Sequence, residues 1–363
     1  MQTKTICFFS GDITRCGGTE KVSIMIANML KRQGRYRIIF LSLTESSREP
    51  FFALEDGIER YRLGEKWINP GPGYIKVIPK LRKFLKAHDV DVIIDIDIVL
   101  DCLSIPAVKG LKTGIISWEH FNYQFEQSSL YRRLILKYSV RRSDYVVTLT
   151  EKDREQYISN LKRRERIKAI YNPIEAADGS EKVEKEKWII TVGRLVQVKG
   201  VDYLIEVAEG VLKKHPDWKW IMLGEGELRT FLEEEISKRQ LENRLILKGN
   251  VQNVGDYLKR AQIYVMTSRF EGLGMCLLEA KAHGLPCVAF DVPTGPAELI
   301  TDGTNGWLIP PFSCEKMEEK IEGLIENGTL RENFSQNAKL GTEKLQAEHI
   351  LAQWNEVIEL VCS

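Results

Sequence analysis

Short runs of apolar residues alternate along the chain with longer stretches in which apolar residues recur every three to four positions. The short runs predict strands and the longer stretches predict amphipathic helices. The first series predicts strands at 4–9, 37–43, 91–98, 113–117, 144–149 and 167–171, and helices at 18–33, 74–88, 128–142 and 151–160. The second predicts strands at 188–192, 218–223, 244–248, 262–266, 286–290 and 307–309, helices at 200–214, 227–239, 253–260, 274–283 and 296–300, and two C-terminal helices. A strand–helix alternation that occurs twice predicts two doubly wound α/β domains in tandem.

The polar segment 174–187 separates the two series. It contains a Gly-Ser pair and no periodic apolar residues, which is typical of a linker. At about 100–200 residues per domain, 363 residues also suggest two domains. We therefore expect domains at 1–173 and 174–345. Since doubly wound sheets bind ligands at the carboxyl ends of their strands, we expect a site in the cleft between these domains.

The composition is that of a soluble globular protein, with 43% hydrophobic and 28% charged residues. No apolar stretch reaches the ~18 residues that span a bilayer, and the longest candidate, 91–100, contains aspartates. The first residues lack the pattern of a signal peptide. Seven cysteines without a C-x-x-C pair indicate a reducing compartment and no zinc cluster, so we expect a cytoplasmic protein.

Charge is distributed unevenly along the chain. The net charge is +1, but residues 1–170 carry +10 and residues 171–363 carry −9. Basic residues are frequent in the predicted helices 74–88 and 128–142, where they suit an anionic lipid surface; a solvated basic face is the alternative. Nucleic acid is disfavoured because no known binding module and no interleaved aromatic residues are present. The candidate contact residues are Lys80, Arg82, Lys83, Arg132, Arg133, Arg141 and Arg142.

Two glutamates, Glu271 and Glu279, flank a glycine-containing turn within SRFEGLGMCLLEA at 268–280. Eight helical steps would separate them by ~12 Å, whereas the two carboxyls of a glycosidase lie about 5–9.5 Å apart. The pair therefore suits an elongated ligand held at both ends, with backbone N–H groups of the helix start between them to receive an anion. Two solvated glutamates are the alternative.

Basic residues and glycines stand at other predicted strand ends. Arg194 and Lys199 share the loop after strand 188–192, so both side chains can converge on one anion. Gly17 and Gly18 open a helix, where glycine allows close approach to a phosphate. The dinucleotide fingerprint G-x-G-x-x-G is absent there, which disfavours a Rossmann dehydrogenase.

Together these motifs resemble family 4 of the retaining glycosyltransferases, which have the GT-B fold. EGLGMCLLE resembles the E-x7-E element of that family, and TVGRLVQVKG at 191–200 resembles its strand end and basic loop. Further similar segments are GGTEKVSIMIANML at 17–30, SWEHFN at 117–122, NPIE at 172–175, LGEGELRTFLEE at 223–234 and GPAELITDGTNGWLIP at 295–310. The resemblance covers nearly the whole chain and is closest to bacterial transferases that build surface polysaccharides or lipid-linked oligosaccharides.

The resemblance implies two facing Rossmann-like domains, with a C-terminal helix at 346–363 that returns to the first. Arg194 and Lys199 would hold the donor diphosphate, His120 and Glu271 would bind hydroxyls of the transferred sugar, and Glu279 would bind the ribose. The residues implied to bind the donor are Gly17, Gly18, Gly272, Leu273, Gly274, Met275 and Glu279.

The triplet Asp95-Ile96-Asp97 offers a second interpretation of the chemistry. In a different glycosyltransferase fold a D-x-D triplet holds a divalent metal, and carboxylate oxygens suit Mg²⁺. The GT-B resemblance instead implies a metal-independent site without a cofactor, in which Arg194 and Lys199 supply the electrostatic stabilisation. A role of Asp97 near the acceptor is a further possibility that the sequence leaves open.

The resemblance implies transfer of a hexosyl unit, with retention of configuration, from a nucleotide sugar to a saccharide acceptor. A UDP-sugar donor and a polyprenyl-diphosphate-linked acceptor at the inner face of the cell membrane are favoured. A GDP-mannose-dependent mannosyltransferase is the alternative within this class. A nucleotide-sugar epimerase of GT-B fold and a non-catalytic sugar- or lipid-binding protein are alternatives of other classes. A hydrolase is disfavoured because no close carboxylate pair is evident.

Overall fold

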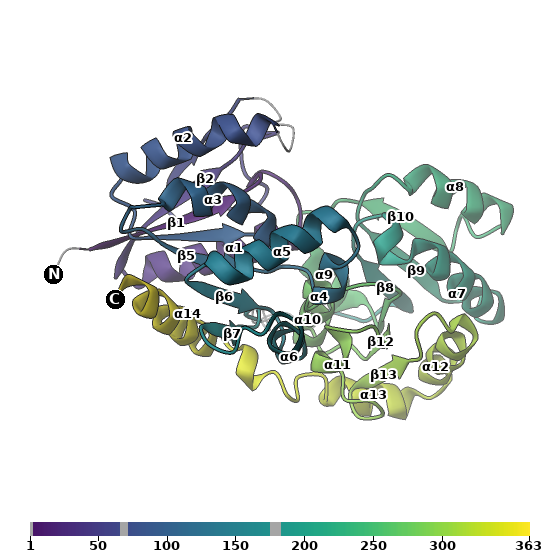
Figure 1. The fold of residues 1–363 in the computed structure, drawn as a ribbon. Coiled ribbons are helices and arrows are strands. Elements are labelled where there is room, and N and C mark those ends of the chain that lie inside the picture. The colour runs from purple at the N-terminus through teal and green to yellow at the C-terminus, as the bar shows by residue number, and fades with distance from the viewer. Residues whose placement is uncertain (1–2, 66–71, 175–182) are drawn as a thin grey trace. The chain divides into compact units, whose positions relative to one another are not determined.

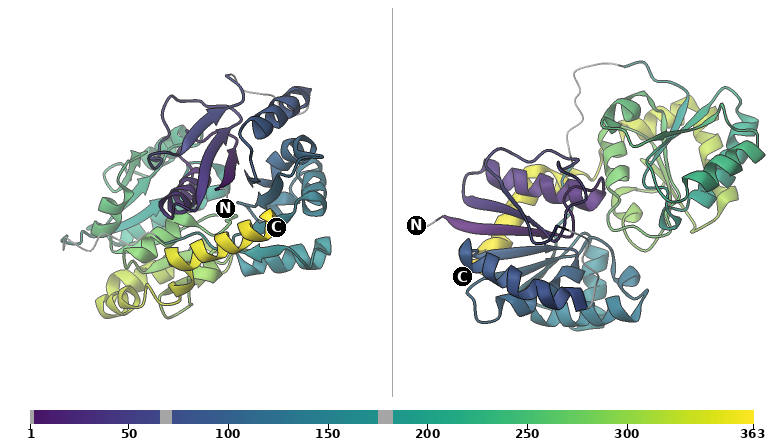
Figure 2. Two further views of the ribbon diagram at one scale, coloured as in Figure 1. Left: turned by 90° about the vertical axis from the view of Figure 1, so that its left-hand side faces the viewer. Right: turned by 90° about the horizontal axis from the view of Figure 1, so that it is seen from above.

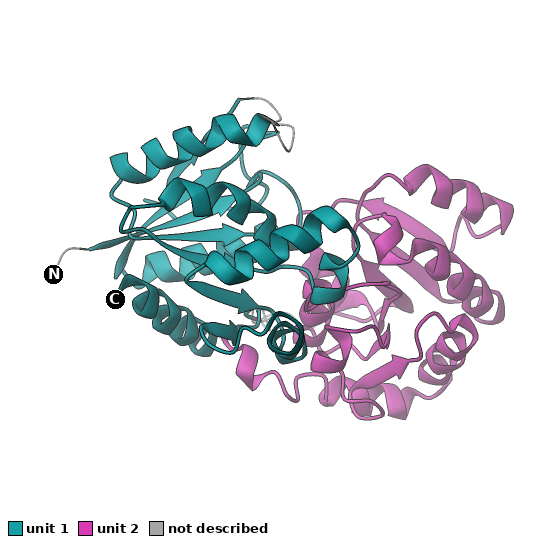
Figure 3. Cartoon of the chain, viewed as in Figure 1, with its two compact units in different colours: residues 1–173, 347–363 teal, residues 174–346 magenta. Residues whose placement is uncertain are grey.

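The computed structural model describes residues 3–65, 72–174 and 183–363 (Figure 1). Contacts within the chain divide it into unit 1, which comprises Met1–Pro173 and Ala347–Ser363, and unit 2, Ile174–Gln346 (Figure 3). The predicted linker 174–187 falls largely outside the described residues, at 175–182. Beyond that gap, the N–H of Glu186 donates to the carbonyl of Arg260 at 2.8 Å.

Unit 1 contains a parallel sheet with helices on both faces (Figure 2). In the described residues its strands are β1 (Lys4–Ser10), β2 (Tyr36–Ser42), β3 (Glu59–Arg62), β4 (Val92–Ile96), β5 (Gly114–Trp118), β6 (Tyr145–Thr148) and β7 (Ile167–Ala169), in the order β3-β2-β1-β4-β5-β6-β7. Its helices are α1 (Gly18–Arg32), α2 (Pro72–Ala87), η1 (Ile98–Leu100), α3 (Asp101–Val108), α4 (Tyr123–Glu126), α5 (Leu130–Arg142), α6 (Glu151–Leu161) and α14 (Ala347–Cys362).

The central strands of unit 1 are buried on both sides, which is why they read as continuous apolar runs. Ile93 of β4 and Leu81 of α2 belong to one apolar core on the face that α2 and α3 cover, and α3 in turn contacts α5. Helices α1 and α14 contact each other, and α14 lies against β4 and β5. The ring of Trp354 in α14 meets that of Trp118 edge-on, at 4.6 Å between centroids.

Unit 2 repeats this architecture. The strands in its described part are β8 (Trp188–Val192), β9 (Lys219–Leu223), β10 (Leu245–Gly249), β11 (Ile263–Met266), β12 (Cys287–Phe290) and β13 (Gly306–Ile309), all parallel, in the order β10-β9-β8-β11-β12-β13. The helices are η2 (Gln197–Lys199), α7 (Val201–Lys214), α8 (Arg229–Lys238), α9 (Val254–Arg260), α10 (Met275–Ala282), α11 (Pro296–Leu299), α12 (Cys314–Glu326), α13 (Gly328–Gln336) and η3 (Glu343–Leu345). Two parallel, doubly wound sheets confirm the predicted fold class.

Some elements differ from the predictions. The prediction of two C-terminal helices was wrong, since α12, α13 and α14 all follow β13 within the described residues. Helices α12 and α13 are separated by Asn327 alone, and its side chain accepts a hydrogen bond from the N–H of Leu330 to cap α13. This cap divides a stretch that the sequence pattern predicts as one continuous helix into α12 and α13.

Candidate functional site

The predicted basic loop and the predicted acidic turn meet in unit 2. The strand order reverses between β8 and β11, and ligands of such sheets bind at that point, beyond the carboxyl ends of the strands. Lys199 follows β8 and Glu271 follows β11, and the Nζ of Lys199 lies 2.7 Å from Oε1 of Glu271. Ser268 Oγ donates to the same oxygen at 2.5 Å. The Glu271 side chain is only 8% exposed, so the carboxylate is held in one position.

The loop that carries Arg194 is fixed by its backbone. The N–H of Leu195 donates to the carbonyl of Glu225 at 2.9 Å, which ties the loop after β8 to the loop after β9. Gly224, at φ +134°, lies so close to Gly193 that a Cβ there would sit 2.0 Å from its carbonyl oxygen. The Arg194 side chain is exposed and makes no ion pair with any residue that the structure describes. A fixed loop thus presents a cation that is available to an anionic ligand.

The turn between Glu271 and α10 contains the other residues that the E-x7-E element indicates. Gly272 is half-buried, Leu273 is buried, and Gly274 has a φ of +88° as the N-cap of α10. Met275 is the first helical residue, so the positive end of the α10 dipole lies beside this turn. Glu279 follows one turn into the helix and is half-buried. Only the part from Met275 onward is helical, so the eight residue steps from Glu271 to Glu279 are not all helical steps.

Two residues that support the turn were not predicted from the sequence. Thr294 Oγ1 donates to the carbonyl oxygen of Glu271 at 2.5 Å. Gly295 has a φ of +94°, and a Cβ there would lie 2.9 Å from the carbonyl oxygen of Leu273. The Thr-Gly-Pro sequence after β12 is the signal that indicates such a close approach.

In unit 1, the predicted glycines open α1. The order of strands reverses between β1 and β4, and Gly17 and Gly18 follow β1 at that switch point. Gly17 is the extended N-cap of α1, and a Cβ there would meet the Glu20 carboxylate at 2.3 Å. The positive end of α1 is therefore placed where an anion could approach the backbone.

His120 follows β5 and is 7% exposed. Its ring lies 4.4 Å from that of Trp118, and its Nε2 has no hydrogen-bond partner among the described residues. Burial lowers the pKa of His120 to about 3, so the imidazole is neutral at physiological pH. A neutral imidazole donates one hydrogen bond from its protonated nitrogen and accepts one at the other, which suits a sugar hydroxyl.

Buried acidic groups hold the His120 loop. Glu119 accepts hydrogen bonds from the N–H of Phe121 at 2.9 Å and from the hydroxyl of Tyr157 at 2.8 Å. Burial, followed by repulsion from Glu126, raises the pKa of the Glu119 carboxyl well above its usual range. The neighbouring histidine thus stands on a backbone that a buried polar network fixes.

Both aspartates of the D-x-D triplet bond to other residues of unit 1. Asp95 is fully buried and accepts a hydrogen bond from Ser104 Oγ at 2.7 Å. Asp97 has a φ of +83°, caps η1 through the N–H of Val99, and lies 3.6 Å from the Arg132 guanidinium. In the described part of the chain, no group of three or more His, Cys, Asp or Glu side chains is arranged to hold a metal ion.

Two of the basic residues predicted to face a lipid surface are engaged inside unit 1, and we no longer assign them to that surface. Arg132 lies 2.6 Å from the fully buried carboxylate of Glu126 and stacks over Phe121 and Phe125. Arg82 donates to the carbonyl of Ala107, in the last turn of α3, and to that of its C-cap Lys109, which compensates groups that the helix end leaves unpaired. The sequence pattern could not show this, because helical periodicity does not indicate which cation has a buried partner.

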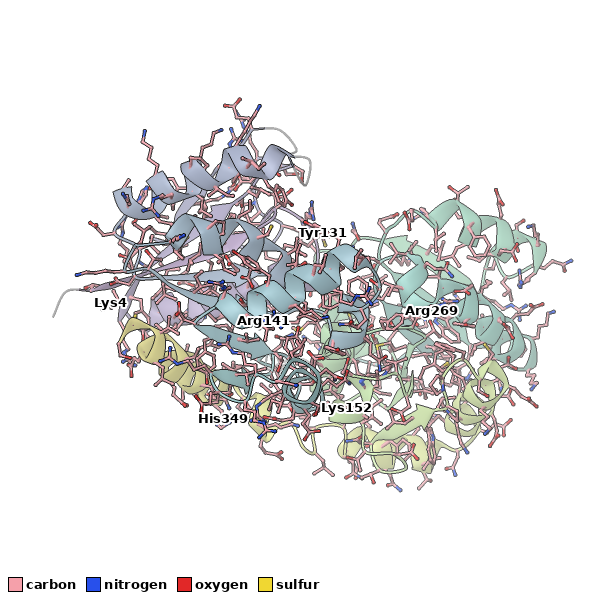
Figure 4. All side chains as sticks on the ribbon, in the orientation of Figure 1. Lys4, Tyr131, Arg141, Lys152, Arg269 and His349 are labelled. Carbon is pink, nitrogen blue, oxygen red and sulfur yellow. The ribbon has the colours of Figure 1, made fainter. Side chains whose placement is uncertain are left out.

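The other predicted basic residues are exposed, and α5 also exposes apolar side chains. Lys80 and Lys83 lie on α2, and Arg133, Arg141 and Arg142 lie on α5. Tyr131 stands near one end of α5 and Arg141 near the other (Figure 4). We call the exposed apolar row of this helix the α5 stripe: Leu130, Tyr131, Leu134 and Tyr138. Its positions recur every three to four residues, so they share one side of the helix.

Comparison with known proteins identifies the family. The family model "Glycosyl transferases group 1" matches residues 174–341, and "Glycosyltransferase Family 4" matches residues 16–178. An uncharacterized glycosyltransferase of Haemophilus influenzae is 32% identical over 98% of this chain and 100% of that protein. The chain belongs to the glycosyltransferases. The resemblance noted in the sequence is thereby confirmed.

Other relatives of this glycosyltransferase have more specific names. The amylovoran biosynthesis glycosyltransferase AmsD of Erwinia amylovora is 26% identical over 95% of this chain and 97% of its own. An α-1,4-N-acetyl-D-galactosaminyltransferase of Campylobacter jejuni, named for an undecaprenyl-diphosphate-linked saccharide, is 26% identical over 94% of this chain and 95% of its own.

Solved structures show the same fold. Anabaena HepE in complex with UDP and glucose superposes with a TM-score of 0.81 at 19% identity, over 97% of this chain and 99% of that one. A point mutant of S. aureus TarM in complex with fondaparinux, α-GlcNAc-glycerol and UDP has a TM-score of 0.70 at 27% identity, over 78% of this chain and 59% of that one. The GT-B fold of this glycosyltransferase is thus confirmed. In its described part, no helix combines the length and apolar character that crossing a membrane requires.

Proposed function

We propose that this glycosyltransferase moves a hexosyl unit from a UDP-sugar to a saccharide acceptor linked to polyprenyl diphosphate, with retention of configuration and without a metal ion. The observation that carries the proposal is the Lys199–Glu271 pair at the switch point of unit 2, with Arg194 exposed on the same loop. The pair places a cation and a hydrogen-bond acceptor side by side, as a sugar joined to a diphosphate requires.

Each residue has a role that its surroundings support. Arg194 and Lys199 bind the diphosphate and stabilise the charge that develops on it as the glycosidic bond breaks. The positive end of α10, at Gly272–Met275, adds to this stabilisation. Glu271 accepts hydrogen bonds from sugar hydroxyls, and Glu279 accepts them from the ribose. No covalent intermediate is needed, because an oxygen of the donor phosphate takes the proton of the acceptor hydroxyl on the face from which the diphosphate departs.

Unit 1 contributes the remaining groups. Gly17 and Gly18 let the backbone at the start of α1 approach the donor. His120, neutral at physiological pH, forms a hydrogen bond with a hydroxyl of the transferred sugar. Asp97, at the end of β4, remains a candidate for contact with the acceptor.

The donor assignment rests on the relatives. Both TarM and HepE are described in complex with UDP, which favours a UDP-sugar over GDP-mannose. The acceptor assignment rests on the C. jejuni relative, whose name specifies an undecaprenyl-diphosphate-linked saccharide, and on AmsD, whose name specifies amylovoran biosynthesis. A role in bacterial surface-glycan synthesis follows from these assignments.

A thermal-shift panel with UDP, GDP, ADP and their common sugars, with and without EDTA, tests the donor site. UDP and one of its sugars should raise the melting temperature whether or not EDTA is present, because a ligand of the folded state stabilises it by mass action. Arg194→Ala should lose the shift. A shift with GDP alone would support the mannosyltransferase alternative, and a shift that EDTA abolishes would contradict metal independence.

Turnover tests the reaction itself. Lys199→Ala should lower transfer by roughly 10²–10³-fold, the effect of removing one group that stabilises transition-state charge. Lys214→Ala is the matched control, since Lys214 also forms a 2.7 Å ion pair, with Glu322, elsewhere in unit 2. An α-linked product from an α-linked donor, read by NMR, would establish retention. Donor conversion without any acceptor would favour the epimerase, and donor binding without conversion would favour the binding protein.

We further propose that the α5 stripe and its basic flanks contact the anionic membrane in which a polyprenyl acceptor resides. Apolar side chains that enter the interface together with cations that face anionic headgroups are the two components of such binding. Replacing Arg133, Arg141 and Arg142 by Glu should abolish co-sedimentation with phosphatidylglycerol vesicles; phosphatidylcholine vesicles are the neutral comparison. The control replaces the exposed unit 2 residues Lys248, Lys316 and Lys339 by Glu. If both variants lost co-sedimentation equally, the loss would reflect net charge in general, and the proposed contact of α5 with the membrane would be rejected.

A further inference from the structure

Arg269 links the two loops of the proposed donor site, the one after β8 and the one after β11. It follows β11 and precedes Glu271 by two residues. Its guanidinium donates to both carboxylate oxygens of Asp202, at 2.7 and 2.5 Å, and to the carbonyl oxygen of Gln197 at 2.9 Å. Asp202 lies in the first turn of α7, directly after the basic loop. The Arg269 side chain is therefore bonded to both ends of the segment that carries Lys199.

The backbones of these two loops are also bonded to each other. The N–H of Arg269 donates to the carbonyl of Val198 at 2.9 Å. Thr267 Oγ1 donates to the carbonyl of Lys199 at 3.2 Å. Gly200, at φ +65°, approaches Thr267 so closely that a Cβ would lie 1.9 Å from its carbonyl oxygen. Residues 267–269 and 197–200 therefore run in direct contact.

An aromatic side chain covers the guanidinium. Arg269 lies 4.2 Å from the ring centroid of Tyr203, which stacks in turn on Phe312. The Arg269 side chain is 19% exposed, so water has limited access to its bonds with Asp202. These bonds raise the pKa of Arg269 and lower the pKa of Asp202, and both groups stay charged at neutral pH.

We propose that Arg269 is a positioning residue, which sets the distance between Lys199 and Glu271 without contacting the donor. This inference rests on the proposed function of that pair. Arg269 bonds to the residues before and after Lys199, and its own backbone leads to Glu271 within two residues. A rotation of one loop against the other would have to break these bonds. The planar fork of arginine is needed because a lysine offers one point charge and cannot hold the carboxylate and the carbonyl at fixed angles.

The variants Arg269→Lys and Asp202→Asn test the proposal in the full-length enzyme. Both should fold and bind UDP within about threefold of the wild-type affinity, since product binding tolerates a small displacement. Their kcat should fall by roughly 10–100-fold, because a misplacement of about 1 Å can cost 10²-fold in rate. The double variant should be no slower than the slower single variant, since both changes break one interaction.

Arg239→Lys is the matched control. Arg239 is also a half-buried arginine of unit 2, bonded to Glu209 at 2.8 Å and to Glu235, but it joins α7 to α8. Arg239→Lys should lower the melting temperature about as much as Arg269→Lys does and leave kcat unchanged. Equal kcat values in Arg239→Lys and Arg269→Lys would overturn the positioning role, as would a loss of kcat that follows the melting temperature across the variants.

A second readout does not depend on turnover. Acetylation of Lys199 by acetic anhydride, followed by peptide mass spectrometry, reports whether its amine is held by Glu271. The rate should rise severalfold in Arg269→Lys and Asp202→Asn and stay constant in Arg239→Lys. If the wild type transfers no sugar but Lys199 labelling responds in this way, the proposed function fails and the positioning role stands. A labelling rate that none of the variants changes would overturn the inference.

Discussion

Two lysines of unit 2 lie in opposite surroundings. Lys199 is 26% exposed and faces the Glu271 carboxylate, so its charge is available to a ligand and compensated without one. Lys281 of α10 is fully buried, and its Nζ has no hydrogen-bond partner among the described residues. Burial lowers the pKa of Lys281, since a low-dielectric interior disfavours the ammonium form. The first lysine is placed for the role proposed above, and the second costs stability.

Lys281→Met should therefore stabilise the protein. Methionine has a similar length and no polar group to desolvate, so we expect a gain of about 1–3 kcal/mol near pH 7, measured by urea unfolding. The unfolded wild type keeps its proton up to about pH 10.4, whereas the folded state releases it at lower pH. Wild-type stability thus rises with pH toward that value, and the gain of the variant should shrink by pH 9.5. A gain that is equal at both pH values would contradict a Lys281 pKa lowered by burial.

His120 gives a prediction at acidic pH. Because its folded pKa is about 3 and that of an unfolded histidine is about 6.5, the unfolded state binds the proton first. Its contribution to stability is present above pH 6.5 and is lost as the pH falls toward 3. Relative to His120→Gln, the wild type should lose ~1.4 kcal/mol per pH unit between pH 6 and pH 5. Parallel pH curves for the two proteins would show that His120 is not neutral in the folded state.

At this scale the sequence predicted residue types better than their partners. The motif in 268–280 indicated Glu271, and the loop in 191–200 indicated Lys199, but only the fold shows that they meet. Arg132 carries the same charge as its exposed neighbour Arg133, yet only Arg132 reaches a buried carboxylate. Such a partner depends on the path of the loop before α5, which local patterns do not encode.

At the scale of elements, the loops after β8, β9 and β11 are bonded to one another through close backbone approaches. Gly200 and Gly224 have positive φ angles and no space for a Cβ, which is why side chains are absent at these positions. The strands bring the loops to one edge of the sheet, and the glycines let them touch there. The geometry of the proposed donor site is therefore a property of three elements rather than of one loop.

Gly200→Ala tests this coupling. A Cβ at Gly200 would meet the Thr267 carbonyl at 1.9 Å in addition to its φ of +65°, so we expect a loss of at least about 3 kcal/mol in unfolding free energy, or loss of transfer in any folded fraction. Gly341→Ala is the control, because Gly341 has a φ of +76° and no atom within 4 Å of the added Cβ. It should lose only ~1–2 kcal/mol, measured in the same urea titration. Similar losses in both variants would mean that the contact with Thr267 is not limiting.

Most elements could be predicted from periodicity because the sheets are parallel and buried, so that their strands read as apolar runs. The exceptions have physical reasons. Strand β3 is a short, polar edge strand with the sequence ERYR and has no apolar period to detect. Helix α3 contains Pro106 and is apolar on several sides, so it lacks the stripe that marks a surface helix.

At the scale of the whole molecule, α14 adds a segment from the other end of the chain to unit 1. Its addition changes the balance of charge little, since unit 1 retains a net +7 and unit 2 a net −6. Its main contribution is apolar: Trp354 is fully buried and contacts Trp118. Periodicity predicted that a helix lies at the end of the chain, whereas the unit on which it docks was implied only by the family resemblance.

Trp354→Ala should destabilise unit 1 selectively. Removing a buried tryptophan costs about 3–5 kcal/mol, and α14 contacts β4 and β5. Hydrogen exchange read by mass spectrometry should accelerate in β4 and β5 and remain unchanged in β9 of unit 2. Uniform acceleration in both units would show that they unfold as one cooperative body and would contradict this prediction.

The position of α14 in the chain also has a consequence for synthesis on the ribosome. Residues 347–363 leave the ribosome only after all of unit 2, although they complete the sheet face of unit 1. At about 5–20 residues per second, the interval is roughly 10–35 s. During that time Trp118 and the adjoining surface of β4 and β5 lack their cover. The nascent first unit should therefore expose apolar surface until α14 is synthesised, and aggregation in overexpressing cells should begin from this face.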